Sequence, residues 1–288
     1  MQYLSNMNNE PNWEWEISTS HKWYQLGLRE LVHYKDIIVS FYRRELLAAY
    51  HQSVIGVSWI VLQPLLTTLF YFLVFNKIVK VSTDNTPPVF FYMSGSILWA
   101  YFSDCLSGAM YSFIHNAHIY NKVYFPRLVV PFSMALNHTV RFAIQFGLFL
   151  LAYIIFMCVS GRFVMSWQVL LTPLLFMQIM AFALGIGLIT SVYVARYRDV
   201  EHIMSFLLRL FMFVTPVFYP ASIVPEHYRM IFWLNPLTPM IETFRTLFFQ
   251  TGTLHFAYIA VSAVTSVSVL MAGLVLFRQK ELKVMDTI

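Results

Sequence analysis

The sequence predicts an all-α integral membrane protein with six transmembrane helices, an N-terminal amphipathic interface helix, and two short re-entrant helices before the last span. Three observations support this fold class. The 288-residue chain is 58% apolar and 11% charged, whereas an average soluble domain is about 25% charged. Five long stretches carry no charged residue, and each can hold the roughly 20 residues of a bilayer-crossing helix. Finally, five of the twelve prolines gather between residues 215 and 252.

The N-terminal part is predicted as a polar tail, 1–20, followed by a cytoplasmic amphipathic interface helix over 21–52. The tail lacks the basic region and the short apolar region of a cleaved signal peptide. In the helix, polar residues recur at spacings of three and four while apolar residues trace another face. Arg29, Arg43 and Arg44 would then lie near anionic lipid headgroups. Two roles stay open for this helix, which either positions the first span or guides a substrate.

The transmembrane domain is predicted over 53–277. Apolar length and flanking charge place its spans at 54–75, 89–113, 129–159, 167–194, 202–218 and 256–277. Twelve Lys and Arg residues fall on the N-terminal side of these spans and five fall on the opposite side. The positive-inside rule therefore puts both termini, including the tail 278–288, in the cytoplasm together with the loop 114–128.

The sequence NKVYFPRLVVP, residues 121–131, begins in that cytoplasmic loop and runs into the next predicted span. Phe125 precedes Pro126 and is pushed out of helical geometry, so a helix over 115–124 should end there. Such a helix offers Asn116, Ile119, Tyr120 and Val123 on neighbouring turns. It would suit a groove in a partner, although a passive connector between two spans is the alternative.

The proline-rich segment 216–252 is predicted to contain two short helices, 230–234 and 240–249, that dip back into the outer leaflet. The first is too short to span a bilayer, and the second carries Glu242 and Arg245. Non-helical backbone at membrane depth occurs where protein or a water-filled cavity satisfies it, so this segment would line or cap a path. An ordinary outside loop is the alternative. The candidate gate residues are Pro216, Tyr219, Pro220, Pro225, Asn235, Pro236 and Pro239.

Three ionisable residues fall inside expected spans, namely Asp104, Arg141 and Arg209. An uncompensated charge at the bilayer centre costs several kcal/mol, so each should face the bundle, face a wet cavity or pair with another. Asp104 and Arg141 could form such a pair. We expect Cys105 and Cys158, both in apolar runs, to be small core residues.

The chain lacks the signatures of several enzyme classes. It contains no G-x-x-x-x-G-K-[ST] phosphate loop, no H-E-x-x-H, no C-x-x-C and no G-x-S-x-G. We therefore expect no catalytic residues, no metal site and no cofactor in this chain, and any ATP would have to be bound elsewhere.

Five stretches, in this order and spacing, resemble the membrane subunit of polysaccharide-exporting ABC transporters, the permeases for O-antigen, capsule and teichoic acid chains. They are RRELLAAYHQSVIGVSWIVLQPL, NKVYFPRLVVP, YRD, PVFYPASIVP and LNPLTP. The resemblance covers about 31–283. One departure is His51, where the family pattern usually has Lys or Arg.

The resemblance implies a half-transporter in the bacterial inner membrane. Two copies of the chain would form a channel, and two copies of a separate ATPase subunit would bind ATP and Mg below it, with no nucleic acid involved. It also implies a periplasmic gate over 216–252 and a coupling segment over 114–128 that docks into the ATPase. The residues expected to couple the two subunits are Asn116, Ile119, Tyr120, Asn121, Lys122, Arg127, Arg198 and Asp199.

The function predicted in this way is ATP-driven export of a lipid-linked polysaccharide. A long polar polymer needs many weak contacts, which aromatic rings supply, and Trp59, Phe70, Tyr71, Trp99 and Tyr219 are the candidate channel-lining residues. One alternative is an ABC exporter of drugs or small lipids. Another is a membrane-embedded transferase that acts on polyprenyl-linked sugars.

That transferase would need a group of catalytic side chains at one membrane face. The only candidate group is Asp199, Glu201 and His202. Because Arg196 and Arg198 are close in sequence, we expect a salt-bridged loop at this position.

Overall fold

The computed structural model describes residues 34–50, 55–120, 125–161, 167–252 and 254–285, which contain helices and no strand. The principal helices are α3 (Trp59–Tyr71), α4 (Pro88–Met110), α6 (Val129–Ser160), α7 (Thr172–Val194), α8 (Arg198–Val214) and α11 (Phe256–Met285). The shorter α-helices are α2 (Lys35–Tyr50), α5 (Ser112–Tyr120), α9 (Glu226–Leu234) and α10 (Leu237–Phe249). Four one-turn or two-turn elements complete the fold, namely η1 (Gly56–Ser58), η2 (Phe72–Ile78), η3 (Trp167–Leu171) and η4 (Ala221–Ile223).

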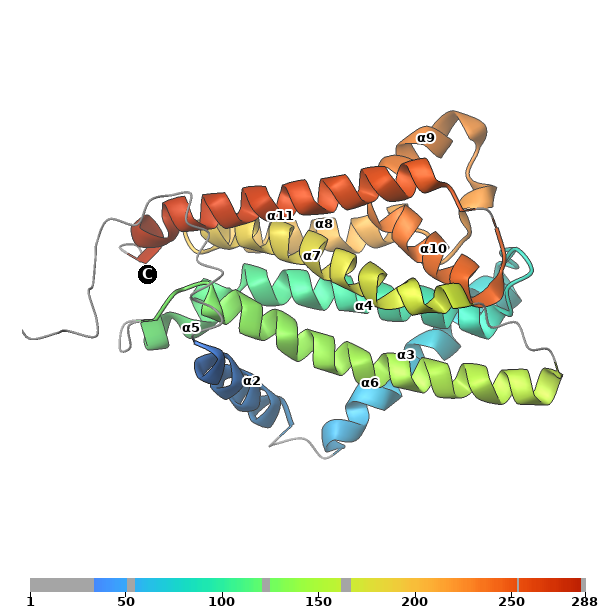
Figure 1. Ribbon diagram of the computed structural model, residues 1–288, viewed down its shortest axis with the longest axis horizontal. Helices are drawn as coiled ribbons and strands as arrows, with labels where there is room; N and C mark the ends of the chain where they lie inside the picture. Colours follow the sequence, from blue (N-terminus) through green and yellow to red (C-terminus); the bar gives the residue numbers. More distant parts are fainter. Residues whose placement is uncertain (1–33, 51–54, 121–124, 162–166, 253, 286–288) are drawn as a thin grey trace, which may run out of the picture.

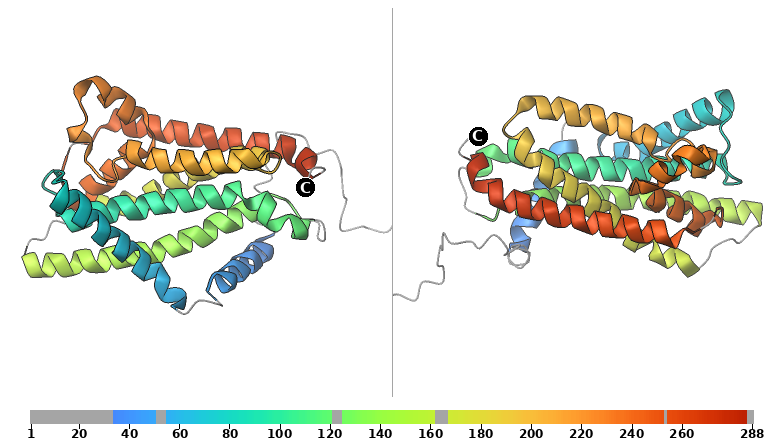
Figure 2. Two further views of the ribbon diagram at one scale, coloured as in Figure 1. Left: turned by 180° about the vertical axis from the view of Figure 1, so that it is seen from behind. Right: turned by 90° about the horizontal axis from the view of Figure 1, so that it is seen from above.

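The long helices form an elongated bundle (Figure 1). Helices α4, α6, α7, α8 and α11 run along its length, and α3 crosses it obliquely (Figure 2). Helices α2 and α5 lie at the same end as the C-terminal end of α11, whereas α9 and α10 lie at the opposite end. The predicted coupling and gate segments are therefore at opposite ends of the molecule.

Four helical segments in the described ranges are long and apolar enough to cross a membrane, namely Gly56–Ile78, Val129–Ser160, Trp167–Val194 and Phe256–Glu281. These overlap four of the six predicted spans. Helix α4 occupies the predicted second span but is less apolar than these four. Helix α8, at the fifth, has 17 residues, fewer than the roughly 20 that usually span a bilayer. The structure thus confirms an all-helical membrane protein, and the count of six spans stays a prediction.

The first predicted span is less regular than expected. Within Gly56–Ile78, a turn of 3-10 helix precedes α3, and a π-helix, η2, follows it. Pro64 lies inside α3, where a proline removes one backbone hydrogen bond. The helical segment also ends at Ile78 rather than at the predicted position 75.

Helix α7 lies between α4 and α11, and small residues bring the three backbones together. A Cβ atom added to Gly185 would lie 2.6 Å from the backbone nitrogen of Leu270 in α11. A Cβ atom added to Gly187 would lie 2.5 Å from the Cβ of Ala109 in α4. Small residues at such positions let transmembrane helices approach closely, so α7 can pack tightly on both sides.

Candidate functional site

Helix α5 forms where the sequence predicts a short cytoplasmic helix, but it begins at Ser112, directly after α4. Ile119 and Tyr120 are in its last turn. Asn121 and Lys122 lie outside the described residues. Arg127 is partly buried in the turn that precedes α6.

Asn116 attaches α5 to α2. Its side chain is fully buried, its Oδ1 accepts a hydrogen bond of 2.5 Å from Arg44 Nη2, and its Nδ2 donates to the Ser112 carbonyl oxygen. Arg44 also donates to Glu45 Oε1 at 2.8 Å, and its guanidinium carbon lies 4.7 Å from the centre of the Phe41 ring. The prediction that Asn116 is offered to a partner is therefore wrong for its side chain, because a buried amide group satisfied within the chain is unavailable outside it.

The other predicted residues at this end are mostly exposed. Arg43 is exposed on α2, and Arg29 lies outside the described residues. Arg198 and Asp199 are exposed in the first turn of α8, where a carboxylate interacts favourably with the helix dipole.

The expected salt-bridged loop is wrong. Among the described residues, no ion pair joins Arg196 or Arg198 to Asp199 or Glu201, and the Arg196 guanidinium lies over the Tyr197 ring at 5.3 Å. The described part of the chain also contains no group of His, Cys, Asp and Glu residues that could hold a metal ion.

At the opposite end, the proline-rich segment folds into two short helices, α9 and α10, in place of the predicted 230–234 and 240–249. Prolines account for where they begin. Pro225 directly precedes α9, Pro236 directly precedes α10, and Pro239 lies in the first turn of α10. Proline is tolerated at these positions because the first backbone N–H groups of a helix have no partner within it.

The break between α9 and α10 is joined to the end of α8. Asn235 is buried, its Nδ2 donates to Thr215 Oγ1 at 3.1 Å, and its Oδ1 accepts from the Leu237 backbone N–H at 3.1 Å. The side chain thus caps α10 and simultaneously binds the residue that follows α8, a structural role for this predicted gate residue.

Residues 216–220 pass from α8 to η4. Pro216 and Pro220 are buried. The Tyr219 hydroxyl donates to the Phe213 carbonyl oxygen at 2.7 Å, and its ring centre lies 5.9 Å from that of Phe232 in α9. These contacts fold the segment back on the last turn of α8.

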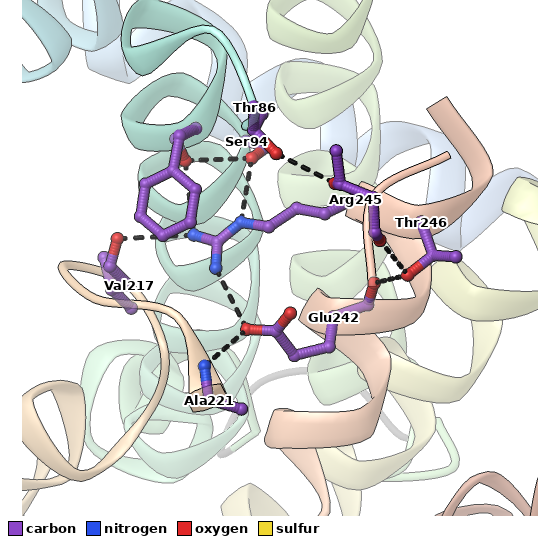
Figure 3. A network of polar contacts seen from close by, with 9 residues as sticks. Thr86, Ser94, Val217, Ala221, Glu242, Arg245 and Thr246 are labelled. Atoms are coloured by element: carbon purple, nitrogen blue, oxygen red, sulfur yellow. Dashed lines mark hydrogen bonds and ion pairs between the residues drawn. The ribbon is translucent and has the colours of Figure 1, made fainter. Parts of the chain in front are cut away.

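Arg245 is the central residue of this end of the molecule (Figure 3). Its side chain is 2% exposed. Its Nη2 donates to the carbonyl oxygens of Phe91 at 3.2 Å and Val217 at 3.4 Å, and its Nε donates to Ser94 Oγ at 3.4 Å. The guanidinium carbon also lies 3.6 Å from the Phe91 ring centre, a cation–π contact.

Glu242 completes this arrangement, which we call the Arg245 clamp. Its Oε1 lies 3.3 Å from Arg245 Nη1 and accepts the Ala221 backbone N–H at 3.2 Å. A Cβ atom added to Gly95 would lie 2.8 Å from the Val217 carbonyl oxygen and 2.9 Å from Arg245 Nη2. The clamp therefore joins α10 to α4 and to the segment between α8 and α9, and it needs glycine at position 95.

Sequence reasoning used Glu242 and Arg245 to argue against a membrane span, and it counted Arg245 among the five basic residues on the side opposite the N-terminal side, but it did not predict the contact between them. A sharper signal was available. Two opposite charges three residues apart in an otherwise apolar helix are expected to pair, and ionisable groups at membrane depth are usually functional.

The aromatic channel candidates separate into two groups. Trp59 and Phe70 in α3 are 40% and 61% exposed. Tyr71 packs against Phe218 at 4.8 Å between ring centres, and Trp99 packs against Phe102 at 5.5 Å. Only the first two are thus directed away from the bundle of this chain.

Asp104 and Arg141, both among the described residues, interact electrostatically but do not form a direct ion pair. Arg141 Nη2 instead donates to Gln63 Oε1 at 3.2 Å. Asp104 interacts electrostatically with His138 as well as with Arg141. Arg209 is exposed on α8. Sequence reasoning missed His138, which lies on the same helix as Arg141, three residues earlier.

Comparison with known proteins supplies independent information. The ABC-2 type transporter family model matches residues 38–249. An O-antigen export system permease protein, RfbA, of Klebsiella pneumoniae is 30% identical over 245 residues, which cover 85% of this chain and 92% of that protein. RfbA of Myxococcus xanthus is 29% identical over 77% of this chain and 84% of its own length. The polysialic acid transport protein KpsM of Escherichia coli is 22% identical over 86% of this chain and 94% of its own length.

Proposed function

Because the chain belongs to the ABC-2 type transporter family, we propose that it is the membrane-embedded permease subunit of an ATP-driven exporter. Its substrate would be a lipid-linked polysaccharide, of the O-antigen or capsule type, moved out of the cytoplasm across the bacterial inner membrane. The observation that carries this proposal is similarity along most of the chain to permeases named for O-antigen export. The similarity to a polysialic acid transport protein extends the proposed substrate from O-antigen to polysaccharides of the capsule type.

The finer architecture of the proposal has six spans, with α4 and α8 crossing the membrane besides the four longer segments. Helices α9 and α10 would be re-entrant, because 9 and 13 residues are too few to cross a bilayer. The ends of the molecule support one orientation. Helix α2, with its basic residues, and the C-terminal end of α11 lie at the same end of the bundle, so the positive-inside rule would put that end in the cytoplasm and the Arg245 clamp at the periplasmic side.

The energy for export would come from a separate ATPase subunit. Asn116 is engaged inside the chain, so contact with that subunit would come from the end of α5, from the residues that follow it, and from exposed groups nearby. Arg198 and Asp199 are exposed and are candidates for this contact. The bond between Asn116 and Arg44 would then transmit a push on α5 to α2.

The path for the polymer would form between two copies of the chain. A polymer in transit must leave each contact as readily as it enters, so weak contacts with flat aromatic faces favour movement. Trp59 and Phe70 project outward from α3 and are available for such a path. Tyr71 and Trp99 pack against other aromatic residues of the same copy. They would support the wall of the path without contacting the polymer.

Reconstitution tests the proposal. The full chain and its ATPase partner would be placed in proteoliposomes, and transport of lipid-linked polysaccharide would be measured with ATP. We expect transport and polymer-stimulated ATP hydrolysis from the complex, and neither from the chain alone or from a complex whose ATPase cannot hydrolyse ATP. Stimulation only by small amphiphiles would instead favour an exporter of drugs or small lipids. Transferase activity of the chain alone on polyprenyl-linked sugars would favour an enzyme.

A further inference from the structure

A polar cavity of about 240 Å³ lies beside the Arg245 clamp. It opens between the loop that precedes α4, the short helix η4, and helices α9 and α10. Acidic, basic, hydroxyl and aromatic side chains line it, namely Asp84, Ser222, Arg229, Trp233, Glu242 and His255. Four of them, Ser222, Arg229, Trp233 and Glu242, lie in the predicted gate segment 216–252, but none was among the candidate gate residues.

The walls of this cavity are held together by hydrogen bonds. The hydroxyl groups of Thr86 and Thr251 lie 2.9 Å apart, which ties the loop before α4 to the segment after α10. The Thr246 hydroxyl lies 2.9 Å from the carbonyl oxygens of both Glu242 and Thr251. In the same loop, Lys80 adopts a φ of 59°, a left-handed conformation that costs about 1–3 kcal/mol in a residue other than glycine. The cavity is thus formed by linked segments.

The carboxylates that line the cavity retain acceptor capacity. Glu242 Oε1 accepts from Ala221 and Arg245, whereas its Oε2 has no hydrogen-bond partner among the described residues. The Asp84 carboxylate accepts one hydrogen bond in the described ranges, a long one of 3.5 Å from Ser82 Oγ, and it also interacts electrostatically with Glu242 and Arg245. Buried or half-buried carboxylate oxygens normally accept at least one hydrogen bond. An oxygen without such a bond from the protein can therefore accept one from a hydroxyl group of a ligand.

The remaining lining residues complement these acceptors. Arg229 is exposed and only distantly paired, with its Nη1 4.0 Å from Glu226 Oε1. The ring of Trp233 stands edge-on to His255 at 5.0 Å and supplies an apolar surface. Acceptors, a guanidinium donor and an indole together match a neutral molecule that carries many hydroxyl groups on a partly apolar ring.

Other ligand classes fit less well. Two carboxylates disfavour an anion by like-charge repulsion, and the described residues hold no group of ligands suited to a metal ion. The volume is below the roughly 300–1,000 Å³ of pockets for drug-sized molecules. We propose that this cavity binds one sugar residue of a polysaccharide at the periplasmic side of the gate segment. The orientation and the source of the glycan rest on the proposed function.

The position of the cavity gives this site a role in export. Glu242 belongs both to the cavity and to the Arg245 clamp, and Ala221, which donates to Glu242, also borders the cavity. A sugar bound there would contact the segment that holds α10 against α4. A single weak contact of this kind would retain the emerging polymer without stalling it.

Binding to the full chain in nanodiscs tests the site. The probe would be the producing cell's surface polysaccharide, released from its lipid by mild acid and cut to short oligosaccharides. Titration calorimetry and saturation-transfer NMR would measure affinity. Asp84→Asn keeps the shape of the loop but replaces a charged acceptor, and we expect affinity to fall about tenfold or more, because charge-assisted hydrogen bonds are the strong ones. Ser222→Ala should weaken binding less. Asp36→Asn, at an exposed residue in the first turn of α2 at the other end of the molecule, should leave affinity unchanged.

The outcome separates the site from the export proposal. Absence of saturable binding, or equal affinities for Asp84→Asn and the unchanged chain, overturns the sugar site even when proteoliposomes export polymer normally. Conversely, binding that depends on Asp84 together with transport of small amphiphiles alone supports the site and overturns polymer export. Thermal unfolding of each variant in nanodiscs checks that lost binding is not lost folding.

Discussion

Replacing Arg245 with Met tests the clamp directly. Methionine retains an unbranched, flexible side chain, but the substitution removes every donor of the guanidinium. The Glu242 carboxylate then loses its ion pair, and the carbonyl oxygens of Phe91 and Val217 lose a hydrogen bond each. Removing one member of a buried ion pair costs about 3–5 kcal/mol. We therefore expect the free energy of unfolding, measured by SDS titration in mixed micelles, to fall by about that amount.

A double-mutant cycle identifies the source of this loss. Glu242→Gln alone should cost about 1–3 kcal/mol, because Arg245 keeps its carbonyl and hydroxyl acceptors. The double variant has a neutral amide at position 242 and therefore no unpaired carboxylate, so its loss of stability should be smaller than the sum of the two single losses by about 1–3 kcal/mol.

Arg229→Met is the matched control. The Arg229 side chain is 46% exposed and its ion pair with Glu226 spans 4.0 Å, so the change should stay within about 0.5 kcal/mol. The reasoning would be refuted if Arg245→Met were equally mild, or if the losses from Arg245→Met and Glu242→Gln simply added.

Three further substitutions test other contacts. Gly187→Leu should prevent stable folding, because even one added carbon collides with α4, whereas Gly147→Leu, where nothing lies within 4 Å, should be tolerated; size-exclusion profiles in detergent compare the two. Asn116→Ala should lower the free energy of unfolding by about 1–3 kcal/mol by leaving a guanidinium without its amide acceptor. Asn116→Asp should restore only the part due to Arg44, because a carboxylate cannot donate to the Ser112 carbonyl oxygen. Tyr153→Phe removes the hydroxyl that donates to the Phe248 carbonyl oxygen and should cost about 1 kcal/mol in the same titration.

The positions of α9 and α10 could be predicted from the sequence because prolines act locally. Each proline fixes its own φ and removes a donor, so a cluster of them forces short elements whatever surrounds it. The predicted first residues of these two helices were less accurate. Helix α9 begins at Glu226, four residues before the predicted start, because Pro225 directly precedes its first turn. The prediction had considered only the length of the apolar run.

The contacts that position the site could not be predicted, because they join residues far apart in the chain. Arg44 binds Asn116 72 residues away, and Arg245 binds the Phe91 carbonyl oxygen 154 residues away. Periodicity and spacing report on neighbours along one helix, whereas these pairs depend on how α2, α5, α4 and α10 pack. Asn116 illustrates the consequence, since its place on a short helix between two predicted spans suggested an outward role, whereas packing buries its side chain inside the chain.

The location of the buried guanidinium follows from the breaks in the helices around it. Between α8 and η4 the chain leaves helical geometry, and the Val217 carbonyl oxygen is directed toward α4 rather than into a helix. A buried carbonyl group outside a helix needs a donor from elsewhere in the protein, and a guanidinium can serve several acceptors at once. Arg245 therefore supplies the hydrogen bond that the Val217 carbonyl oxygen needs, and the same bond holds α10 against the segment between α8 and η4. Any motion that opens this end must either move α10 together with residues 215–221 or break the clamp, and the first alternative preserves every buried partner.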